Sequence, residues 1–234
     1  MVKLPTLEEL LEAGVHFGHK TARWNPKMKP YIFAAKAGVH VINLEKTQEL
    51  LKNALDFLAE EARAQKSIVF VGTKKQAEEI VKKAAESCDS FYVTDRWLGG
   101  IITNFEIVQR AFKKLERNKV TLQSEEANQM SKRDKVMLQK EIEKSEKLVG
   151  GLVKLQKRPD VLILIGAYDE KNALMEAKKV GAKIIGLVDT NADPTKVDFP
   201  IPANDDATKS ISLFSELFAK TIRENRGTAK PIEK

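Results

Sequence analysis

The sequence is poor in cysteine and in long apolar runs. Cys88 is its single cysteine, which excludes an internal disulfide and a cysteine-rich metal site, and fits a small core residue in a reducing cytosol. The longest apolar run, residues 161–167, is far too short to span a bilayer. Residues 1–5 lead straight into an expected helix without an apolar signal region, so we expect neither secretion nor a membrane partner.

Acidic residues are missing from residues 13–44, although charged residues make up 31% of the chain. The same segment carries cations and aromatic rings, and Pro26 and Pro30 interrupt regular structure. Cations beside flat rings in a stiffened loop are typical of a surface that binds a phosphate backbone with exposed bases. The alternative is a loop whose aromatic rings pack on the core and whose lysines are only solvated.

Histidine is scarce as well, and all 3 histidines lie in the first forty residues. No Ser–His–Asp or Cys–His set is recognisable, so the sequence shows no catalytic constellation of these kinds. His16 and His19 are spaced to share a metal ion, but no further Cys, His or acid lies near them in the sequence. That isolation favours a structural or RNA-facing role for both, with no metal site.

The sequence does contain enough apolar residues for a sizeable core. It has 234 residues, is 42% hydrophobic and carries a formal net charge of +7, which favours a polyanionic partner. Short apolar strands alternate with helices, which predicts a parallel sheet with helices on both faces. We expect strands at residues 40–43, 67–71, 91–93, 161–165, 184–188 and 197–201, and helices at 7–13, 44–64, 73–86, 169–179 and 205–222.

One long insertion interrupts this alternation, at residues 105–157. It contains thirteen Lys or Arg against eight Asp or Glu, and its apolar residues recur every three or four positions in two helical stripes. Ser131 and Asp134 have capping-box spacing, so the second helix should start near Lys132 and run to about Leu155. The stripes are too narrow for a core, so we predict a protruding antiparallel hairpin. The alternative is an ordinary helical pair that lies on the body.

Ligands of such sheets meet the loops at the carboxyl ends of the strands. Here Lys74 and Lys75 are expected in the first turn of a helix, where a bound phosphate would offset the repulsion from the helix dipole. The rival hypothesis is therefore an α/β enzyme or sensor that binds a phosphorylated small molecule at residues 72–75. Aspartates of the neighbouring loops could hold magnesium, although they more often cap helices and form turns: Asp169, Asp189, Asp193, Asp205 and Asp206.

Several blocks resemble a known family in order and in residue type. They include residues 12–19 (Glu-Ala-Gly-Val-His-Phe-Gly-His), 23–33, 43–47, 71–74, 96–100 (Arg-Trp-Leu-Gly-Gly), 103–104, 159–160, 188–191 and 201–207. Together they cover nearly the whole chain to about Arg226, and they resemble the bacterial-type small ribosomal subunit protein S-two family.

The resemblance implies a flavodoxin-like or Rossmann-like body, a parallel sheet sandwiched by helices, with an inserted antiparallel coiled-coil hairpin. It implies a non-enzymatic, cytoplasmic component of the small ribosomal subunit on its solvent side, bridging head and body. The partners implied are 16S-type ribosomal RNA, neighbouring small-subunit proteins and the messenger-RNA-binding protein S-one. It implies no cofactor beyond magnesium associated with the RNA, and no homo-oligomer.

The chain departs from the family at four places. The tip at residues 120–130 lacks the usual turn, Phe105 stands where tryptophan is common, residues 154–157 replace a stretch that often holds glycines, and residues 166–168 lack the usual aspartates.

We divide the chain into a body (1–104 and 158–226), a hairpin (105–157) and a tail (227–234).

The combined reading predicts which residues meet RNA. Those of the body are Lys20, Arg23, Trp24, Asn25, Lys27, Lys29, Lys74, Lys75, Arg96, Trp97 and Asn104. Those of the hairpin are Arg110, Lys113, Lys114 and Arg117. Trp24 and Trp97 should stack on bases or pack beside the cations, and Tyr31 and Phe33 are the candidates for a protein partner. A coiled-coil adaptor that binds only protein is a third hypothesis.

Overall fold

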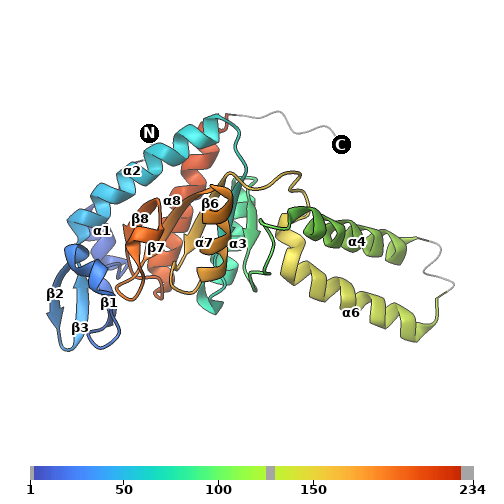
Figure 1. The fold of residues 1–234 in the computed structure, drawn as a ribbon, viewed down its shortest axis with the longest axis horizontal. Helices are drawn as coiled ribbons and strands as arrows, with labels where there is room; N and C mark the ends of the chain where they lie inside the picture. The colour runs from blue at the N-terminus through green and yellow to red at the C-terminus, as the bar shows by residue number, and fades with distance from the viewer. Residues whose placement is uncertain (1–2, 125–129, 228–234) are drawn as a thin grey trace.

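A five-stranded parallel sheet forms the middle layer of the computed structural model, which describes residues 3–124 and 130–227 (Figure 1). The strand order is β5-β4-β6-β7-β8. The bounds are β4 Ile68–Val71, β5 Phe91–Val93, β6 Val161–Ile165, β7 Lys183–Val188 and β8 Phe199–Pro202. This confirms the predicted parallel sheet and places each of its strands within about two residues of the expected position. Within the described residues, no helix is both long and apolar enough to cross a membrane.

Helices cover both faces of the sheet, because successive strand residues point to opposite sides. Ile68, Phe70 and Ile163 face a core shared with α1 (Leu7–Glu12), α2 (Leu44–Arg63), α3 (Lys75–Ser87) and α8 (Thr208–Asn225). Val69 and Leu162 face the opposite core, which α7 (Lys171–Val180) covers together with the loop before α4 (Phe105–Gln123). The continuous apolar strands of the sequence therefore mark a sheet that is buried on both sides.

The acid-free N-terminal segment is a small antiparallel sheet and not the irregular loop that we expected. Its strands are β1 (Phe17–Lys20), β2 (Ile32–Lys36) and β3 (Val39–Ile42), in the order β1-β3-β2, and a 3-10 helix, η1 (Pro26–Tyr31), leads into β2. Only β3 was expected from the sequence. Neither outer strand buries a side chain, so both lack the apolar alternation by which strands are recognised.

The inserted segment forms two antiparallel helices that project from the body (Figure 1). They are α4 and α6 (Lys132–Val149), and a 3-10 turn, η2 (Gly150–Leu152), follows. We call this pair the arm. The second helix ends at Val149 and not near Leu155, and residues 125–129 of the predicted tip lie outside the described residues.

The base of the arm belongs to the core, contrary to our expectation that the stripes were too narrow. Phe105, Phe112, Leu115, Val149 and Leu152 are buried against residues of the sheet. Further out, Val108 and Ile142 are only partly buried. The helical pair is thus continuous with the body at one end and protrudes at the other. Its coiled-coil packing, and the division into body, arm and tail, stay predictions.

Side-chain caps begin three of the helices. Thr6 and Glu9 complete the capping box of α1, Asn43 caps α2, and Ser131 accepts a hydrogen bond from the amide of Asp134. Thr73 and Gln76 have the spacing of a capping box, but the box does not form, because α3 begins at Lys75 with Lys74 in the N-cap position. Asp205 and Asp206 precede α8 but do not cap it, since Ala207 is its N-cap.

Candidate nucleic-acid interface and the charged cluster beside it

The small N-terminal sheet docks on the loop that follows β7. The amide of Asn25 donates to the carbonyl oxygen of Thr190 at 2.7 Å, and the amide of His19 donates to Thr190 Oγ1 at 2.8 Å. Gly18 allows this approach, because a Cβ atom there would lie 2.6 Å from Thr190 Cγ2. The cation-rich segment is therefore held at the carboxyl end of the parallel strands.

Most of the predicted cations of this segment are exposed. They are Lys20, Arg23 and Lys29, with Lys36 on the neighbouring strand. Lys27 is already engaged, since its Nζ lies 2.8 Å from Asp193 Oδ2. Asn25 is half-buried and uses its side chain to accept from the amide of Lys27. The segment thus presents a basic surface to solvent, in agreement with its composition.

The aromatic residues of the segment divide between packing and exposure. The Trp24 ring is 37% exposed and lies 5.1 Å from the His40 ring, centroid to centroid. Tyr31 packs partly against the core, whereas Phe33 is 75% exposed. An exposed large apolar side chain of this kind usually marks a contact with another molecule when others lie beside it. Leu11 and Phe33 both line a hollow between α1 and the small sheet.

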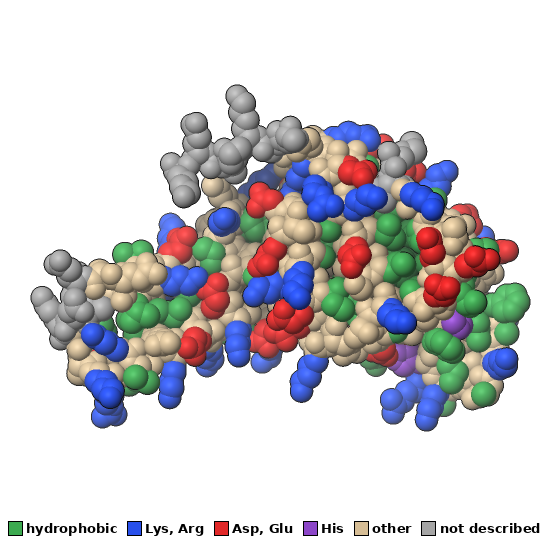
Figure 2. Space-filling view, turned by 180° about the vertical axis from the view of Figure 1, so that it is seen from behind, with side chains coloured by type: hydrophobic (Ala, Val, Ile, Leu, Met, Phe, Trp, Pro, Cys, Tyr) green, Lys and Arg blue, Asp and Glu red, His purple; other side chains and the backbone are tan. Residues whose placement is uncertain are grey.

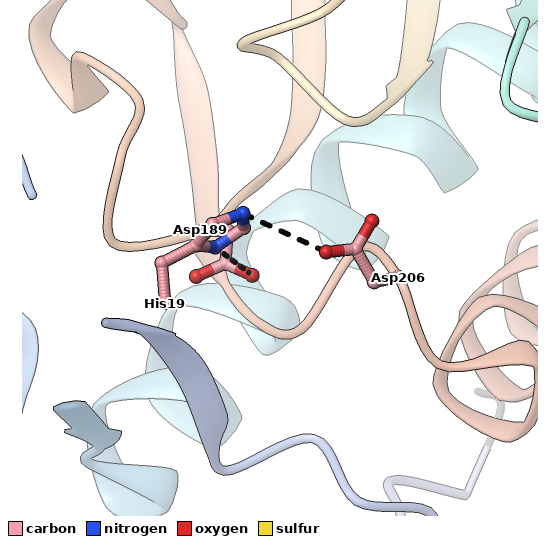
Figure 3. Close-up of side chains that lie close together, drawn as sticks. All are labelled: His19, Asp189 and Asp206. Atoms are coloured by element: carbon pink, nitrogen blue, oxygen red, sulfur yellow. Dashed lines mark ion pairs between the residues drawn. The ribbon is translucent and has the colours of Figure 1, made fainter. Parts of the chain in front are cut away.

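His19 links this segment to two aspartates of distant loops (Figure 3). Its Nδ1 lies 3.1 Å from Asp189 Oδ2, and its Nε2 lies 3.6 Å from Asp206 Oδ2. The hydrogen bond with Asp189 raises the pKa of His19, against the opposing effect of burial. The three residues offer ligand atoms that all lie within 4.8 Å of one another, so a neutral His19 and two carboxylates could hold a divalent cation. The sequence pointed to Asp189 and Asp206 as possible magnesium ligands but did not connect them with His19, because they lie about 170 or more residues from it.

Lys74 is bound by the protein's own carboxylates and not held open for phosphate. Its Nζ lies 2.5 Å from Asp205 Oδ1, 2.7 Å from Asp206 Oδ1 and 3.2 Å from Asp169 Oδ2. Burial lowers the pKa of the Lys74 ammonium, but the carboxylates of Asp205 and Asp206 outweigh it and raise the pKa above the usual value. Burial raises the pKa of the Asp205 carboxyl to about 7, against the attraction of Lys74. Removal of Lys74 would leave that carboxyl without its cation.

A buried carboxyl group of the protein also lies at the start of α3. Glu170 is buried, and its Oε1 accepts a hydrogen bond from the amide of Thr73 at 2.7 Å. Burial raises the pKa of this carboxyl group, against the hydrogen bond from Thr73. A carboxyl group of the protein therefore lies where the rival hypothesis required a phosphate. Lys75 remains exposed on the first turn of α3.

The hollow next to this cluster is mixed in charge. It has a volume of about 550 Å³ and is lined by His19, Arg23, Trp24, Lys74, Tyr168, Asp169, Asn191 and Asp206. The acidic residues offset the cations, so the hollow is not an anion pocket. Its basic side is the one that carries Arg23.

The loop between β5 and α4 carries three residues that were predicted to meet RNA, of which two are exposed and one is buried. Arg96 and Asn104 are exposed, as a role in binding requires. Trp97 is only 5% exposed, and its Nε1 donates to Glu176 Oε1 at 3.1 Å. The expectation that the Trp97 ring stacks on a base is therefore corrected, because the ring is packed in the core. Glu176 was not among the predicted residues; nothing in the sequence separates it from the other glutamates of exposed helices.

The predicted cations of the arm lie on exposed positions of α4. Arg110, Lys113 and Arg117 recur at steps of three and four residues, which places them on one face of the helix. Lys114 is paired with Glu141 of α6 at 2.7 Å, and a second such pair joins Lys119 to Glu146. These pairs link the two helices of the arm. The remaining cations form a basic stripe along α4, away from the cluster at His19.

Comparison with known proteins places the whole chain in one group. A family model described as ribosomal protein S2 matches residues 10–225. The small ribosomal subunit protein uS2 of Psychromonas ingrahamii is 45% identical, over 94% of this chain and 91% of its own length. Its counterpart in Geotalea uraniireducens is 44% identical over 97% of this chain and 89% of its own, and that of Petrotoga mobilis 44% over 94% and 77%.

Proposed function

Because the chain belongs to the ribosomal protein S2 family, we propose that it binds small-subunit ribosomal RNA through two separate basic surfaces, one on the body and one on the arm. Family membership makes it a structural protein of the small ribosomal subunit that acts in translation in the cytoplasm, and not an enzyme. The proposal concerns which residues contact the RNA, and how.

The body surface consists of the exposed residues Lys20, Arg23, Trp24, Lys29 and Arg96 with Lys75 and Asn104 beside the neighbouring strand ends. Backbone phosphates are contacted mainly by Lys and Arg, which fix register but read no sequence. Lys74 and Trp97 have no part in this surface, since the first is neutralised by carboxylates and the second is buried. Lys27 would contribute only if phosphate displaced Asp193.

The arm surface consists of Arg110, Lys113 and Arg117, with Lys114 at its edge. A single observation supports the proposal that the arm binds RNA: α4 presents cations along one exposed face. Exposed cations of this kind add little to the stability of the helical pair. Surface ion pairs contribute about 0–1 kcal/mol each, so the stripe is better explained by a polyanionic partner than by stability. Magnesium, in this proposal, accompanies the RNA and is not bound by the protein alone.

The salt dependence of RNA binding tests the two surfaces separately. Affinity for single-stranded RNA falls with a slope of about 0.7 per neutralised phosphate in a plot of log K against log salt, and of about 0.9 for a duplex. We expect Lys20→Gln/Arg23→Gln/Lys29→Gln and Arg110→Gln/Lys113→Gln/Arg117→Gln each to reduce the slope for 16S-type RNA by roughly 2–3. The matched control replaces three exposed lysines of other helices, Lys52, Lys83 and Lys209, with Gln.

Two outcomes would contradict the proposed surfaces. One is an RNA-binding constant that does not change with salt concentration, and the other is a control triple variant whose slope of log K against log salt falls as much as that of the other two variants. Sedimentation of tagged protein through a sucrose gradient provides the cellular test. We expect co-migration with small subunits; a light, RNA-free peak would favour a protein-only adaptor.

The exposed apolar patch at the far end of the body supports a protein partner. Figure 2 shows hydrophobic side chains gathered on the small sheet, at the opposite end of the molecule from the arm. Leu11, Phe17 and Phe33 are 54%, 54% and 75% exposed. We propose that this patch contacts neighbouring small-subunit proteins and supports docking of protein S-one. Phe33→Ser should abolish co-purification of S-one from the same organism, whereas Met175→Ser, a control at another large apolar side chain that is 57% exposed, should not.

A further inference from the structure

Glu176 of α7 receives hydrogen bonds from most of the loop that leads into the arm. Trp97 Nε1 and the amide of Gly100 donate to its Oε1 at 3.1 and 2.7 Å. The amides of Ile102 and Thr103 donate to its Oε2 at 3.1 and 3.2 Å, and Thr103 Oγ1 donates to the same atom at 3.1 Å. Two residues after Thr103, α4 begins.

These hydrogen bonds require a carboxylate to be buried, since Glu176 is only 8% exposed. Burial alone would raise the pKa of Glu176, but the amides of Gly100 and Thr103 lower it below the usual value, so the group is charged at neutral pH. A charged acceptor with five donors is a strong and directional anchor, because charge-assisted hydrogen bonds are shorter and stronger than neutral ones. It fixes the start of α4 to a helix that is packed on the sheet.

The other end of the arm has a different anchor. Gly151, in the 3-10 turn η2 that follows α6, lies so close to β5 that a Cβ atom would come within 2.3 Å of the carbonyl oxygen of Tyr92. Gln109 Nε2 of α4 also donates to the carbonyl oxygen of Gln156 at 3.0 Å. The arm is therefore attached to the body at both ends. Glu176 of α7 holds the loop that leads into α4, and the edge strand β5 contacts the turn that follows α6.

We propose that Glu176 is a positioning residue that sets the direction of the arm relative to the body, so that the two basic surfaces reach the same RNA at once. This inference rests on the proposed function. Two linked contacts bind more tightly than either alone only where the link allows both to engage, and the advantage reaches 10²–10⁴-fold. An arm free to swing would keep both surfaces and lose part of that advantage.

The decisive experiment separates arm direction from RNA contact. In RNA-free Glu176→Gln protein, spin labels at Lys140→Cys in the arm and Lys209→Cys on α8 should give a broader distance distribution than in the parent, because an amide offers one acceptor and repels the remaining donors. Affinity for the full RNA should fall about tenfold or more. Affinity for RNA fragments that reach only one surface should change less than twofold.

Control variants guard against a simple folding defect. Glu79→Gln, at an exposed position of α3, removes the same charge without touching the loop and should leave every readout unchanged. Thr103→Val removes one of the five bonds and should give an intermediate width and affinity even if Glu176→Gln folds poorly. An unchanged distance distribution in folded Glu176→Gln and Thr103→Val protein would overturn the inference. Failure of the parent protein to bind the RNA at all would instead overturn the proposed function.

Discussion

At the scale of single residues, polar side chains tie distant parts of the chain together. Asp160, just before β6, accepts hydrogen bonds from the amide of Ser67 at 2.9 Å and from its hydroxyl at 2.8 Å, and Lys157 Nζ lies 3.2 Å away. Burial opposes the charge, yet the Ser67 bonds and Lys157 lower the pKa of Asp160 to about 2. These contacts join the starts of two neighbouring strands, β4 and β6.

The depressed pKa of Asp160 predicts a pH-dependent contribution to stability. Because the folded-state pKa of about 2 lies below the usual carboxyl value of 3.8, the contribution is present above pH 4 and is lost as the pH falls through 2. We expect Asp160→Asn to lower the free energy of unfolding by about 1–2 kcal/mol at pH 7, after allowance for solvent screening. Urea titrations from pH 7 to pH 2 measure it. A deficit that stays constant over this range would show that the charge of Asp160 contributes nothing.

Lys74 shows how a residue type can mislead at this scale. Its place after a buried strand suggested a phosphate site, and that pattern is common in α/β proteins. The partner that decided otherwise, Asp205, is 131 residues away and becomes a neighbour only in the folded chain. Trp97 shows the same limit, because Glu176, which accepts a hydrogen bond from its indole, lies 79 residues away along the chain.

At the scale of elements, the arm depends on local helix signals more than the body does. Its outer part buries few residues, so caps and helix propensity matter where packing does not decide. Ser131 accepts from the amide of Asp134 at 3.2 Å and caps α6 at the end far from the body. The base, in contrast, is stabilised by Phe105, Phe112 and Leu152, which belong to the core.

This difference predicts a local effect of the cap. Ser131→Ala should cost about 1 kcal/mol of helix stability, and hydrogen exchange of the first turns of α6 should accelerate severalfold. Exchange in β6 should not change, because the core does not sense the outer end of the arm. Ser145→Ala, inside the same helix, is the control and should slow exchange slightly if it acts at all. Equal acceleration in β6 and α6 would mean that the arm unfolds only with the whole protein.

At the scale of the whole molecule, paired charges and exposed cations occupy different parts of the surface. The carboxyl ends of the strands, where enzymes of this architecture bind ligands, hold a closed set of opposite charges: Lys74 and His19 with Asp169, Asp189, Asp205 and Asp206. Arg23 is exposed beside that set, and Arg110, Lys113 and Arg117 are exposed on the arm. Figure 2 shows Lys and Arg side chains on both the body and the arm. The charges at the strand ends are thus paired within the protein, whereas these cations face solvent.

Ligand stabilisation distinguishes the ribosomal proposal from the hypothesis of a phosphorylated small molecule. We expect nucleotides and sugar phosphates at millimolar concentration to leave the melting temperature of RNA-free protein unchanged within one degree, because Lys74 and the start of α3 already contact carboxyl groups of the protein. A fragment of 16S-type RNA should raise it by several degrees, since any ligand that binds only the folded state stabilises it. Thermal melts monitored by circular dichroism measure both. A nucleotide effect as large as that of RNA would revive the rival.

The sequence by itself determined the parallel sheet, the helices on its faces, the inserted helical pair and the excess of positive charge. These follow from short-range periodicity and composition, which any stretch of chain displays without reference to the rest. Two strands of the small sheet at residues 17–42 were not predicted, because neither buries a side chain. Only the tertiary structure decided which charges neutralise one another and which remain exposed, because His19, Lys74 and Glu176 take their partners from segments at least 70 residues away.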